Sequence, residues 1–313
     1  MKKIKDIGEF GLIDLITRKP RKKDVVVGIG DDAAVIKTKG LQVLTTDCLV
    51  EGDHFRRDWF TPLQIGMKAI EISISDVAAM GGLPQYVLIS LGLPQDLDVD
   101  FVKEIYNGMW KSCKKYDMEI IGGNMTHSDQ IFISVTMVGM VEKKNLKLRR
   151  GAIPGDFIVV SGHLGFGRAG LRLFQKKQDG FNKVKKRYLE PKARLDYAHQ
   201  VRSFVNSMID VSDGLVPEVR HICDQSKCGA IIYNDKIPIN DEVRQVAKIL
   251  NEDEYDYALF GGEDFELVFT VSKNNIDKID GYLVGEITKC KTVKVKTGNN
   301  KKIVTKKGYD HFS

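Results

Sequence analysis

Residues 41–47 read LQVLTTD, a run of apolar and β-branched residues that ends on an aspartate. The pattern recurs, because VVVGIGDD (25–32) ends on two aspartates and SMID (207–210) ends on one. Such runs, bounded by Gly or Asp, are typical of strands. The acids therefore fall where predicted strands end, in a helical-looking segment EISISDVAAM (71–80), or after a glycine pair in GGEDFEL (261–267); they are Asp31, Asp32, Asp47, Asp76, Asp210, Asp213, Glu263, Asp264 and Glu266.

A single aspartate after a strand is usually a turn former or a helix cap. Several such sites along one chain suggest a shared purpose. If the acids converge, their charges repel, and bound cations are needed to keep them ionised at neutral pH. Carboxylates next to glycines suit Mg²⁺ that is shared with a polyphosphate.

Composition is that of a soluble, globular protein of two domains. The chain has 313 residues, a formal charge of +6, and hydrophobic and charged contents of 42% and 29%, which excludes a disordered chain or a fibre. No apolar run approaches the length of a membrane span. The basic start MKKIKDIGEF is followed by neither an apolar core nor a cleavage site, so we expect a cytoplasmic protein without a secretory signal.

The five cysteines are scattered and form no CxxC pair, so neither a disulfide framework nor a zinc site is expected. A metal would sit on oxygen ligands, as magnesium, manganese or calcium does. Lysines are dense at 18–23, 183–187 and 289–307. No aromatics are interleaved and no nucleic-acid module is recognisable, and the last stretch reads as an exposed hairpin with lysines on its solvent side. We expect no nucleic-acid partner.

Strand-like and helical runs alternate, which predicts an α+β fold. We expect strands at 25–29, 41–45, 86–93, 131–141, 157–160, 208–211, 229–233 and 265–271, and helical segments at 63–80, 101–116 and 168–200. A basic run and the turn-rich GAIPGD (151–156) mark a break. The predicted domains are residues 1–148 and 149–313.

No phosphate-loop motif of the Walker or protein-kinase type occurs in the sequence. Gly165, Gly167 and Gly170 fit G-x-G-x-x-G after a strand, with Glu190 at the expected distance for a dinucleotide site. The intervening sequence is helical and rich in Lys and Gln, without a second strand ending at Glu190. We interpret the motif as a glycine-rich entrance to a helix, which could still lie near a nucleotide.

Taken together and in order, six motifs resemble the thiamine-monophosphate kinase family. They are GIGDDAAV (28–35), TTDCLVEGDHF (45–55), SISDVAAMGG (73–82), IDVSDGL (209–215), GGEDFEL (261–267) and GYDHF (308–312), and the opening IGEFGLI (7–13) is also similar. Each motif alone is weak evidence. The ordered set runs from the first ten residues to the last five and is highly specific.

The resemblance implies the two-domain fold shared with aminoimidazole ribonucleotide synthetase, selenophosphate synthetase and a hydrogenase maturation factor. It implies a homodimer in which the N-terminal domains pair, with the C-terminal domain completing an active-site cleft that holds ATP and several magnesium ions. The implied reaction is direct phosphoryl transfer from ATP to thiamine monophosphate, which gives thiamine diphosphate. No membrane association is implied.

The resemblance also implies roles for individual residues. Magnesium ligands would be Asp32, Asp47, Asp76, Asp210 and Asp213, with Thr45, Thr46 and Asn124 assisting. Four of these, Asp32, Asp47, Asp76 and Asp210, would support catalysis through metal-assisted charge stabilisation, without a nucleophilic side chain. ATP contacts would be Gly123, Asn124, Arg149 and Ser212. Contacts to thiamine monophosphate would be His54, Glu263 and Tyr309.

These roles make physical sense for in-line transfer, which needs aligned substrates and neutralised phosphate charge more than covalent chemistry. His54 could donate to a phosphate or to the pyrimidine. Glu263 could offset the fixed positive charge of the thiazolium ring, and Tyr309 could stack on a ring.

One position departs from the family pattern. The usual Gly-Gly-Asp-Thr segment reads Gly-Gly-Asn-Met-Thr at 122–126, so Asn124 keeps an oxygen for a metal but loses the charge. This puts the number of magnesium ions in question. Asp129 could compensate if the loop curls back.

The sequence leaves two alternative functions open. The first is another ATP-using member of the superfamily, although the cysteine expected of selenophosphate synthetase before GIGDDAAV is absent from LITRKPRKK (15–23), and the purine-pathway enzyme would differ at TTDCLVEGDHF. The second is a catalytically inactive module that binds nucleotide or cations, with Asn124 as a first sign of decay.

Overall fold

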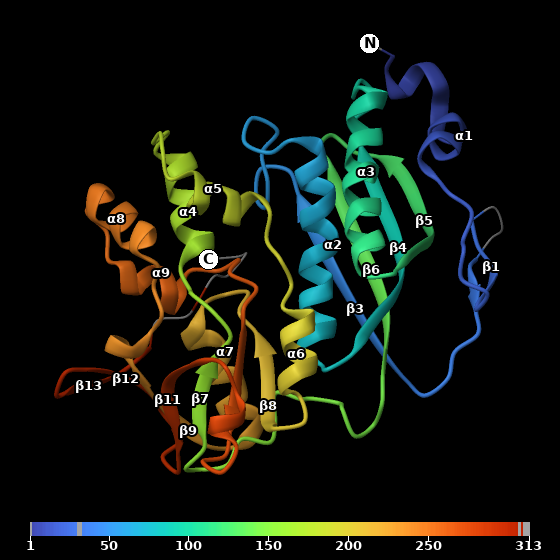
Figure 1. The fold of residues 1–313 in the computed structure, drawn as a ribbon. Coiled ribbons are helices and arrows are strands. Elements are labelled where there is room, and N and C mark those ends of the chain that lie inside the picture. Colours follow the sequence, from blue (N-terminus) through green and yellow to red (C-terminus); the bar gives the residue numbers. More distant parts are fainter. Residues whose placement is uncertain (1, 30–32, 306–307, 309–313) are drawn as a thin grey trace. The chain divides into compact units, whose positions relative to one another are not determined.

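The computed structural model describes residues 2–29, 33–305 and 308. The chain divides into two compact units, of residues 1–77 with 82–143 and of residues 78–81 with 144–313. Figure 1 shows the elements of both units. Among the described residues, none of the helices combines the length and the apolar character needed to cross a bilayer.

The N-terminal unit is built on a four-stranded sheet with strand order β3-β6-β4-β5, in which the β4–β5 pair is parallel. A separate antiparallel pair, β1 with β2, precedes it. The elements are α1 (Ile4–Ile16), β1 (Val25–Val27), β2 (Val35–Ile36), β3 (Leu41–Val50), α2 (Pro62–Ala79), β4 (Leu83–Leu93), α3 (Val99–Lys115), β5 (Glu119–His127) and β6 (Phe132–Val141).

Helices α2 and α3 lie side by side over one face of this sheet (Figure 1). Their close contact depends on two glycines: a Cβ at Gly66 would lie 1.9 Å from the Ile105 carbonyl oxygen, and a Cβ at Gly108 would lie 2.0 Å from that of Leu63. Any side chain there would push the helices apart. Ile70 and Ile74 on α2 and Ile105 on α3 are all fully buried.

The C-terminal unit has a seven-stranded sheet with strand order β13-β12-β9-β11-β7-β10-β8. Its pairs are antiparallel except for β12 with β9. The elements are β7 (Phe157–Val160), α4 (Phe166–Gln175), α5 (Asn182–Leu189), α6 (Leu195–Val201), β8 (Val205–Asp210), α7 (Leu215–Ser226), β9 (Gly229–Tyr233), η1 (Asn234–Lys236), α8 (Asp241–Leu250), α9 (Glu254–Phe260), β10 (Leu267–Val271), η2 (Ile276–Lys278), β11 (Tyr282–Thr288), β12 (Val293–Thr297) and β13 (Asn300–Ile303).

The sequence predicted most of these elements, and the mixed α+β character of both parts is confirmed. The predicted hairpin near the C-terminus is also present, as β12 and β13. Helices α1, α7, α8 and α9 and strands β2 and β11 were not predicted, and two further regions differ from the prediction. The long helical stretch at 168–200 is three short helices. Lys177, Gly180 and Phe181 have positive φ and break the helical path between α4 and α5, and α5 ends where Glu190 leaves the helical conformation (φ −129°, ψ 65°) just before Pro191. Strand β5 was missed, since its glycines and polar residues hide the strand pattern.

Candidate active site

A group of oxygen ligands joins β3 to α2 in the N-terminal unit. Thr45 Oγ1 donates to Asp76 Oδ2 at 2.5 Å, and Ser73 Oγ donates to Asp47 Oδ2 at 2.8 Å. Thr45 and Asp47 are two residues apart on a strand, so both side chains point to the face that α2 covers. Ser73 and Asp76 are three residues apart on the helix, so they share the face that meets the strand. The predicted metal ligands Thr45, Asp47 and Asp76 thus lie together.

The two carboxylates of this group are close enough to affect each other. Burial and the negative charge of Asp76 raise the pKa of Asp47 from 3.8 to about 6, although the Ser73 hydrogen bond acts to lower it. A divalent cation between them would remove the repulsion and favour the ionised form. All the atoms of this group that could ligate a metal are oxygens, which are the ligands that magnesium prefers.

Another predicted magnesium ligand, Asp32, lies outside the described residues. Within the part of the chain that the structure describes, no group of three or more His, Cys, Asp or Glu side chains is placed to hold a metal ion. Asp47 and Asp76 therefore form a pair in the described structure. Their role in binding magnesium stays a prediction.

Asn124 lies apart from this group, at the opposite edge of the same sheet. The register across the sheet aligns Cys48 with Ser134, Ser134 with Ser90, and Ser90 with Asn124. Directly paired residues project to one face of a sheet, so Asn124 shares the face of Cys48, which is opposite to the face of Asp47. Gly123 and Asn124 are both exposed. Thr46 lies on the Asn124 face of the sheet, 3.4 Å from Thr136 Oγ1, and Asp129 is exposed after β5.

His54 is held in a short loop after β3. Its Nδ1 accepts a hydrogen bond from the Val50 amide at 3.2 Å, and its carbonyl oxygen accepts one from Lys68 Nζ at 3.0 Å. Because Nδ1 is the acceptor, the proton of the neutral imidazole is on Nε2. Lys68 itself is fully buried on α2, so this charged side chain fixes the loop from within the unit.

In the C-terminal unit the predicted site residues gather where β8 ends and α7 begins. Asp210 is the last residue of β8 and is 5% exposed. Ser212 Oγ and the Asp213 amide both donate to Glu218 Oε1, at 3.3 and 3.1 Å. Burial raises the pKa of Glu218 to about 7, while the positive charge of the nearby Arg149 acts to lower it.

Glu263 contacts the same segment between β8 and α7. Its amide donates to the Ser212 carbonyl oxygen at 2.8 Å. A Cβ at Gly262 would lie 2.3 Å from that oxygen, which explains the glycine pair before Glu263. Gly308 also reaches this region, since its Cβ would lie 2.7 Å from the Asp213 carbonyl oxygen. The next residue, Tyr309, lies outside the described residues.

The structure therefore brings together Thr45, Asp47 and Asp76 in one unit, and Arg149, Ser212, Asp213 and Glu263 in the other. The glycine motif at 165–170 has a structural role instead. The amides of Gly165 and Gly167 donate to the Asp264 carboxylate, at 2.6 and 3.0 Å, so an internal acid takes the place at the start of α4 where a phosphate would bind in a nucleotide loop.

Sequence reasoning missed three supporting residues, Ser73, Lys68 and Glu218. A Ser three residues before Asp76 is a detectable signal for a shared helix face. A Glu in the first turn of a helix, just after a Ser-Asp-Gly turn, is likewise a capping signal. Lys68 carries no such signal, because a lysine in an amphipathic helix normally faces solvent.

Comparison with known families first gives the class of protein. The chain matches the family "AIR synthase related protein, N-terminal domain" over residues 30–141 and the corresponding C-terminal domain over residues 154–297. These two matches and the two-unit architecture define an AIR synthase related protein, which confirms the predicted fold class.

Individual relatives narrow the class further. The chain is 39% identical to thiamine-monophosphate kinase of Aquifex aeolicus (strain VF5), covering 99% of this chain and 100% of that relative. It is 36% identical to the enzyme of Bacillus subtilis (strain 168), covering 97% and 99%. The chain belongs to the thiamine-monophosphate kinase family.

Solved structures agree with this assignment. The structure of AaThiL complexed with AMPPCP and TMP has a TM-score of 0.82 and 38% identity, and covers 100% of this chain and 99% of that one. Hydrogenase maturation protein HypE is only 18% identical but has a TM-score of 0.76, with 90% and 93% covered. The second likeness shows the shared fold.

Proposed function

We propose that the protein transfers the terminal phosphoryl group of ATP to the phosphate of thiamine monophosphate, giving thiamine diphosphate and ADP. The observation that carries this proposal is membership of the thiamine-monophosphate kinase family over the whole chain. It is supported by the similar structure of AaThiL, which was solved with AMPPCP and TMP. The grouping of Ser212, Asp213 and Glu263 around one loop adds a structural reason.

The chemistry needs alignment of two phosphates and charge neutralisation rather than a nucleophilic side chain. The acceptor phosphate is already largely ionised near neutral pH, so no strong base is required. In this proposal Arg149 and Ser212 bind the nucleotide, with Gly123 and Asn124. His54, whose proton is on Nε2, donates to the acceptor, and Glu263 faces its cationic ring.

Thr45, Asp47 and Asp76 would hold magnesium in the N-terminal unit, and the raised pKa of Asp47 is the observation that fits a missing positive charge. Asp32, Thr46, Asn124, Asp210 and Asp213 are further proposed ligands. Magnesium would supply charge neutralisation on the ATP phosphates. The protein's own contribution is to fix these oxygens, through Ser73 on Asp47 and Thr45 on Asp76.

A homodimer that pairs N-terminal units is part of the proposal. One face of the four-stranded sheet is covered by α2 and α3, and the other exposes apolar side chains. Leu44, in the middle of β3 on that second face, is 68% exposed. An apolar sheet face of this kind is typical of an interaction surface. A cytoplasmic location, and the absence of nucleic-acid or membrane partners, also stay predictions.

The test is the reaction itself. Purified protein should form thiamine diphosphate and ADP from thiamine monophosphate and ATP, and EDTA should stop the reaction. Free thiamine should not replace the monophosphate, because it lacks the acceptor phosphate. Turnover of thiamine, or no turnover of the monophosphate, would contradict the proposal. ATP binding without any turnover would favour an inactive nucleotide-binding module.

A further inference from the structure

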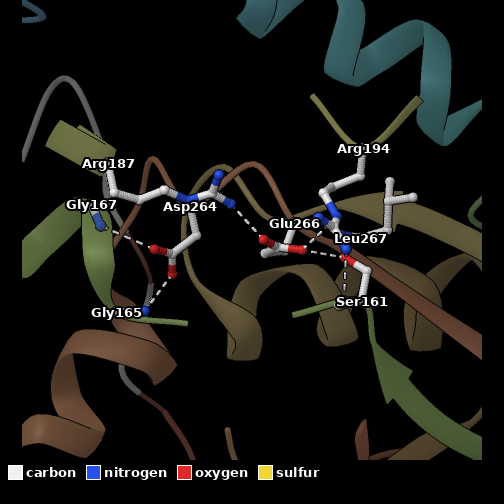
Figure 2. A network of polar contacts seen from close by, with 8 residues as sticks. All are labelled: Ser161, Gly165, Gly167, Arg187, Arg194, Asp264, Glu266 and Leu267. Atoms are coloured by element: carbon white, nitrogen blue, oxygen red, sulfur yellow. Dashed lines mark hydrogen bonds and ion pairs between the residues drawn. The ribbon is translucent and has the colours of Figure 1, made fainter. Parts of the chain in front are cut away.

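Two buried acids, Asp264 and Glu266, lie in the same loop as Glu263, residues 261–266. They are 2% and 3% exposed, whereas Glu263 is only half-buried. Figure 2 shows that the two side chains project to different partners, Asp264 to Gly165 and Gly167, and Glu266 to Arg187, Arg194 and Ser161. Neither acid is among the residues proposed to contact magnesium, ATP or thiamine monophosphate.

Asp264 joins the loop to the start of α4. Its Oδ2 accepts from the Gly165 amide at 2.6 Å and its Oδ1 accepts from the Gly167 amide at 3.0 Å. Both oxygens are thus used at a helix N-terminus, where a carboxylate is favoured by the unpaired amides and by the helix dipole. A Cβ at Gly167 would lie 2.2 Å from the Gly262 carbonyl oxygen, so helix and loop are in direct contact.

Glu266 joins the other end of the loop to α5, to the segment before α6 and to Ser161, which follows β7. Arg187 Nη2 lies 2.5 Å from its Oε1, and Arg194 Nε lies 3.1 Å from its Oε2. Ser161 Oγ donates to Oε2 at 2.5 Å and in turn accepts from the Leu267 amide at 2.8 Å. Two cations around one buried carboxylate compensate the cost of burying its charge.

Asp264 and Glu266 anchor this loop, and the backbone around these two anchors is strained. Glu263 has φ +65° and Phe265 has φ +51°, a conformation that costs non-glycine residues roughly 1 kcal/mol or more each. Both strained residues donate backbone hydrogen bonds to the segment after β8, Glu263 to Ser212 at 2.8 Å and Phe265 to Val211 at 2.9 Å. The loop keeps this shape because its surroundings hold it.

We propose that Asp264 and Glu266 are positioning residues, which hold residues 261–266 in the strained conformation that places Glu263 beside Ser212. The proposal rests on the function proposed above, in which Glu263 faces thiamine monophosphate and Ser212 faces ATP. It assigns the shape of the acceptor site to an internal network of hydrogen bonds and ion pairs rather than to the substrate. Loss of either anchor lets the loop relax and moves Glu263 away from its ligand.

The experiment compares Asp264→Ala, Asp264→Asn and Glu266→Gln with the natural protein. KM for thiamine monophosphate should rise about 10- to 100-fold in Asp264→Ala, because small misplacements of a contact are costly, and KM for ATP should rise less. Asp264→Asn keeps one acceptor oxygen and should rescue part of the loss. Glu266→Gln keeps the shape but not the charge, so its two arginines lose their anion and an intermediate effect is expected.

Asp156 supplies a matched control. It is a buried aspartate, 4% exposed, that accepts from the Ile153 amide and from Asn206 Nδ2. It precedes β7, while Ser161 follows the opposite end of that strand. Asp156→Asn should lower the unfolding temperature but leave KM for thiamine monophosphate unchanged. An equal rise of this KM in the control would overturn the proposal, since any loss of stability would then suffice.

Hydrogen exchange gives a readout that does not depend on activity. The Glu263 and Phe265 amides should exchange faster in Asp264→Ala and Glu266→Gln than in the natural protein and in Asp156→Asn. Unchanged exchange and unchanged KM in folded variants would overturn the proposal. If Asp264→Ala does not fold, the two conservative variants decide. If the natural protein lacks turnover, the proposed function fails, while the exchange measurement still decides whether the anchors hold the loop.

Discussion

Ser73 Oγ donates a 2.8 Å hydrogen bond to Asp47 Oδ2 from the same helix, α2, that carries Asp76. The strand residue Asp47 is therefore held by one helical side chain while its charge is opposed by another. Without a cation the ionised form of this half-buried acid is disfavoured, because partial burial and the charge of Asp76 both raise its pKa. The repulsion between Asp47 and Asp76 can therefore be tested by measuring protein stability as well as activity.

The first prediction concerns the pH dependence of metal-free stability. The pKa of Asp47 is raised to about 6 in the folded protein from 3.8, so the folded state binds more protons than the unfolded state between these values. The free energy of unfolding should then fall as pH rises from about 4 to 6 and stay low above that. Asp47→Asn should remove the penalty and raise stability in EDTA at pH 8, by up to about 3 kcal/mol.

The measurement is denaturant unfolding in EDTA at pH 5 and pH 8. The gain in unfolding free energy caused by Asp47→Asn should be larger at pH 8 than at pH 5. Added magnesium should stabilise the natural protein more than Asp47→Asn. Asp129→Asn is a suitable control, because Asp129 is exposed in the turn after β5. A gain that is equal at both pH values would show that Asp47 is not strained by its charge.

The second prediction concerns Asp76. Asp76→Asn should reduce kcat by about 100-fold or more, because a group that supports charge in the transition state contributes at that scale. Metal-free stability should not fall, since one of the two repelling charges is lost. Glu71→Gln on the same helix is the control; Glu71 accepts from Lys115 Nζ and Tyr116 Oη and belongs to the packing of α2 on α3. Near-normal turnover of Asp76→Asn at saturating magnesium would make Asp76 a structural residue.

Sequence motifs named candidate site residues, whose roles stay predictions, but they could not show the contacts that support those residues. Asp47, Asp76, Ser212 and Glu263 could be named because each belongs to a motif that resembles the family's. The prediction that Asp47 ends a strand was wrong, because β3 continues to Val50. The pairing of Thr45 with Asp76 could not be foreseen, because it joins residues 31 positions apart, and periodicity carries no information about which strand meets which helix.

Glycine spacing predicted a tight entrance to a helix, but it could not show which group binds the glycine amides. Gly165 and Gly167 fit a phosphate loop by spacing, yet their amides bind Asp264, which is 97 to 99 positions away. Strand β5 was hidden for a related reason, since Gly122 and Gly123 weaken the β-propensity of the run that contains them. Tertiary contacts decided both cases.

The third prediction concerns the exposed sheet face. Leu44→Glu places a charge at a position that is 68% exposed in the isolated chain. It should convert the proposed dimer to a monomer with little change in the unfolding temperature at low concentration, because a dimer interface cannot bury an unpaired carboxylate without cost. Sedimentation velocity measures this directly. Leu41→Glu, on the other face of β3, is the control, and a variant dimer as tight as the natural one would exclude this face as the interface.

The last prediction concerns Asn124, where the chain departs from its family's pattern. A neutral oxygen binds a hard cation less well than a carboxylate does. Asn124→Asp should therefore move the magnesium dependence of the reaction to lower concentration, with a smaller effect on the maximum rate. Coincident titrations of the two proteins would mean that the Asn124 oxygen faces the nucleotide and does not limit metal binding.

The position of Asn124 adds a second, sharper test. Asn124 and Asp47 lie at opposite edges and on opposite faces of one sheet, so in one chain their side chains should belong to different ions. The changes in metal-free unfolding free energy caused by Asn124→Asp and Asp47→Asn should then add within about 0.5 kcal/mol in the double variant. A larger coupling would show that the two positions affect each other energetically and would contradict their assignment to different ions.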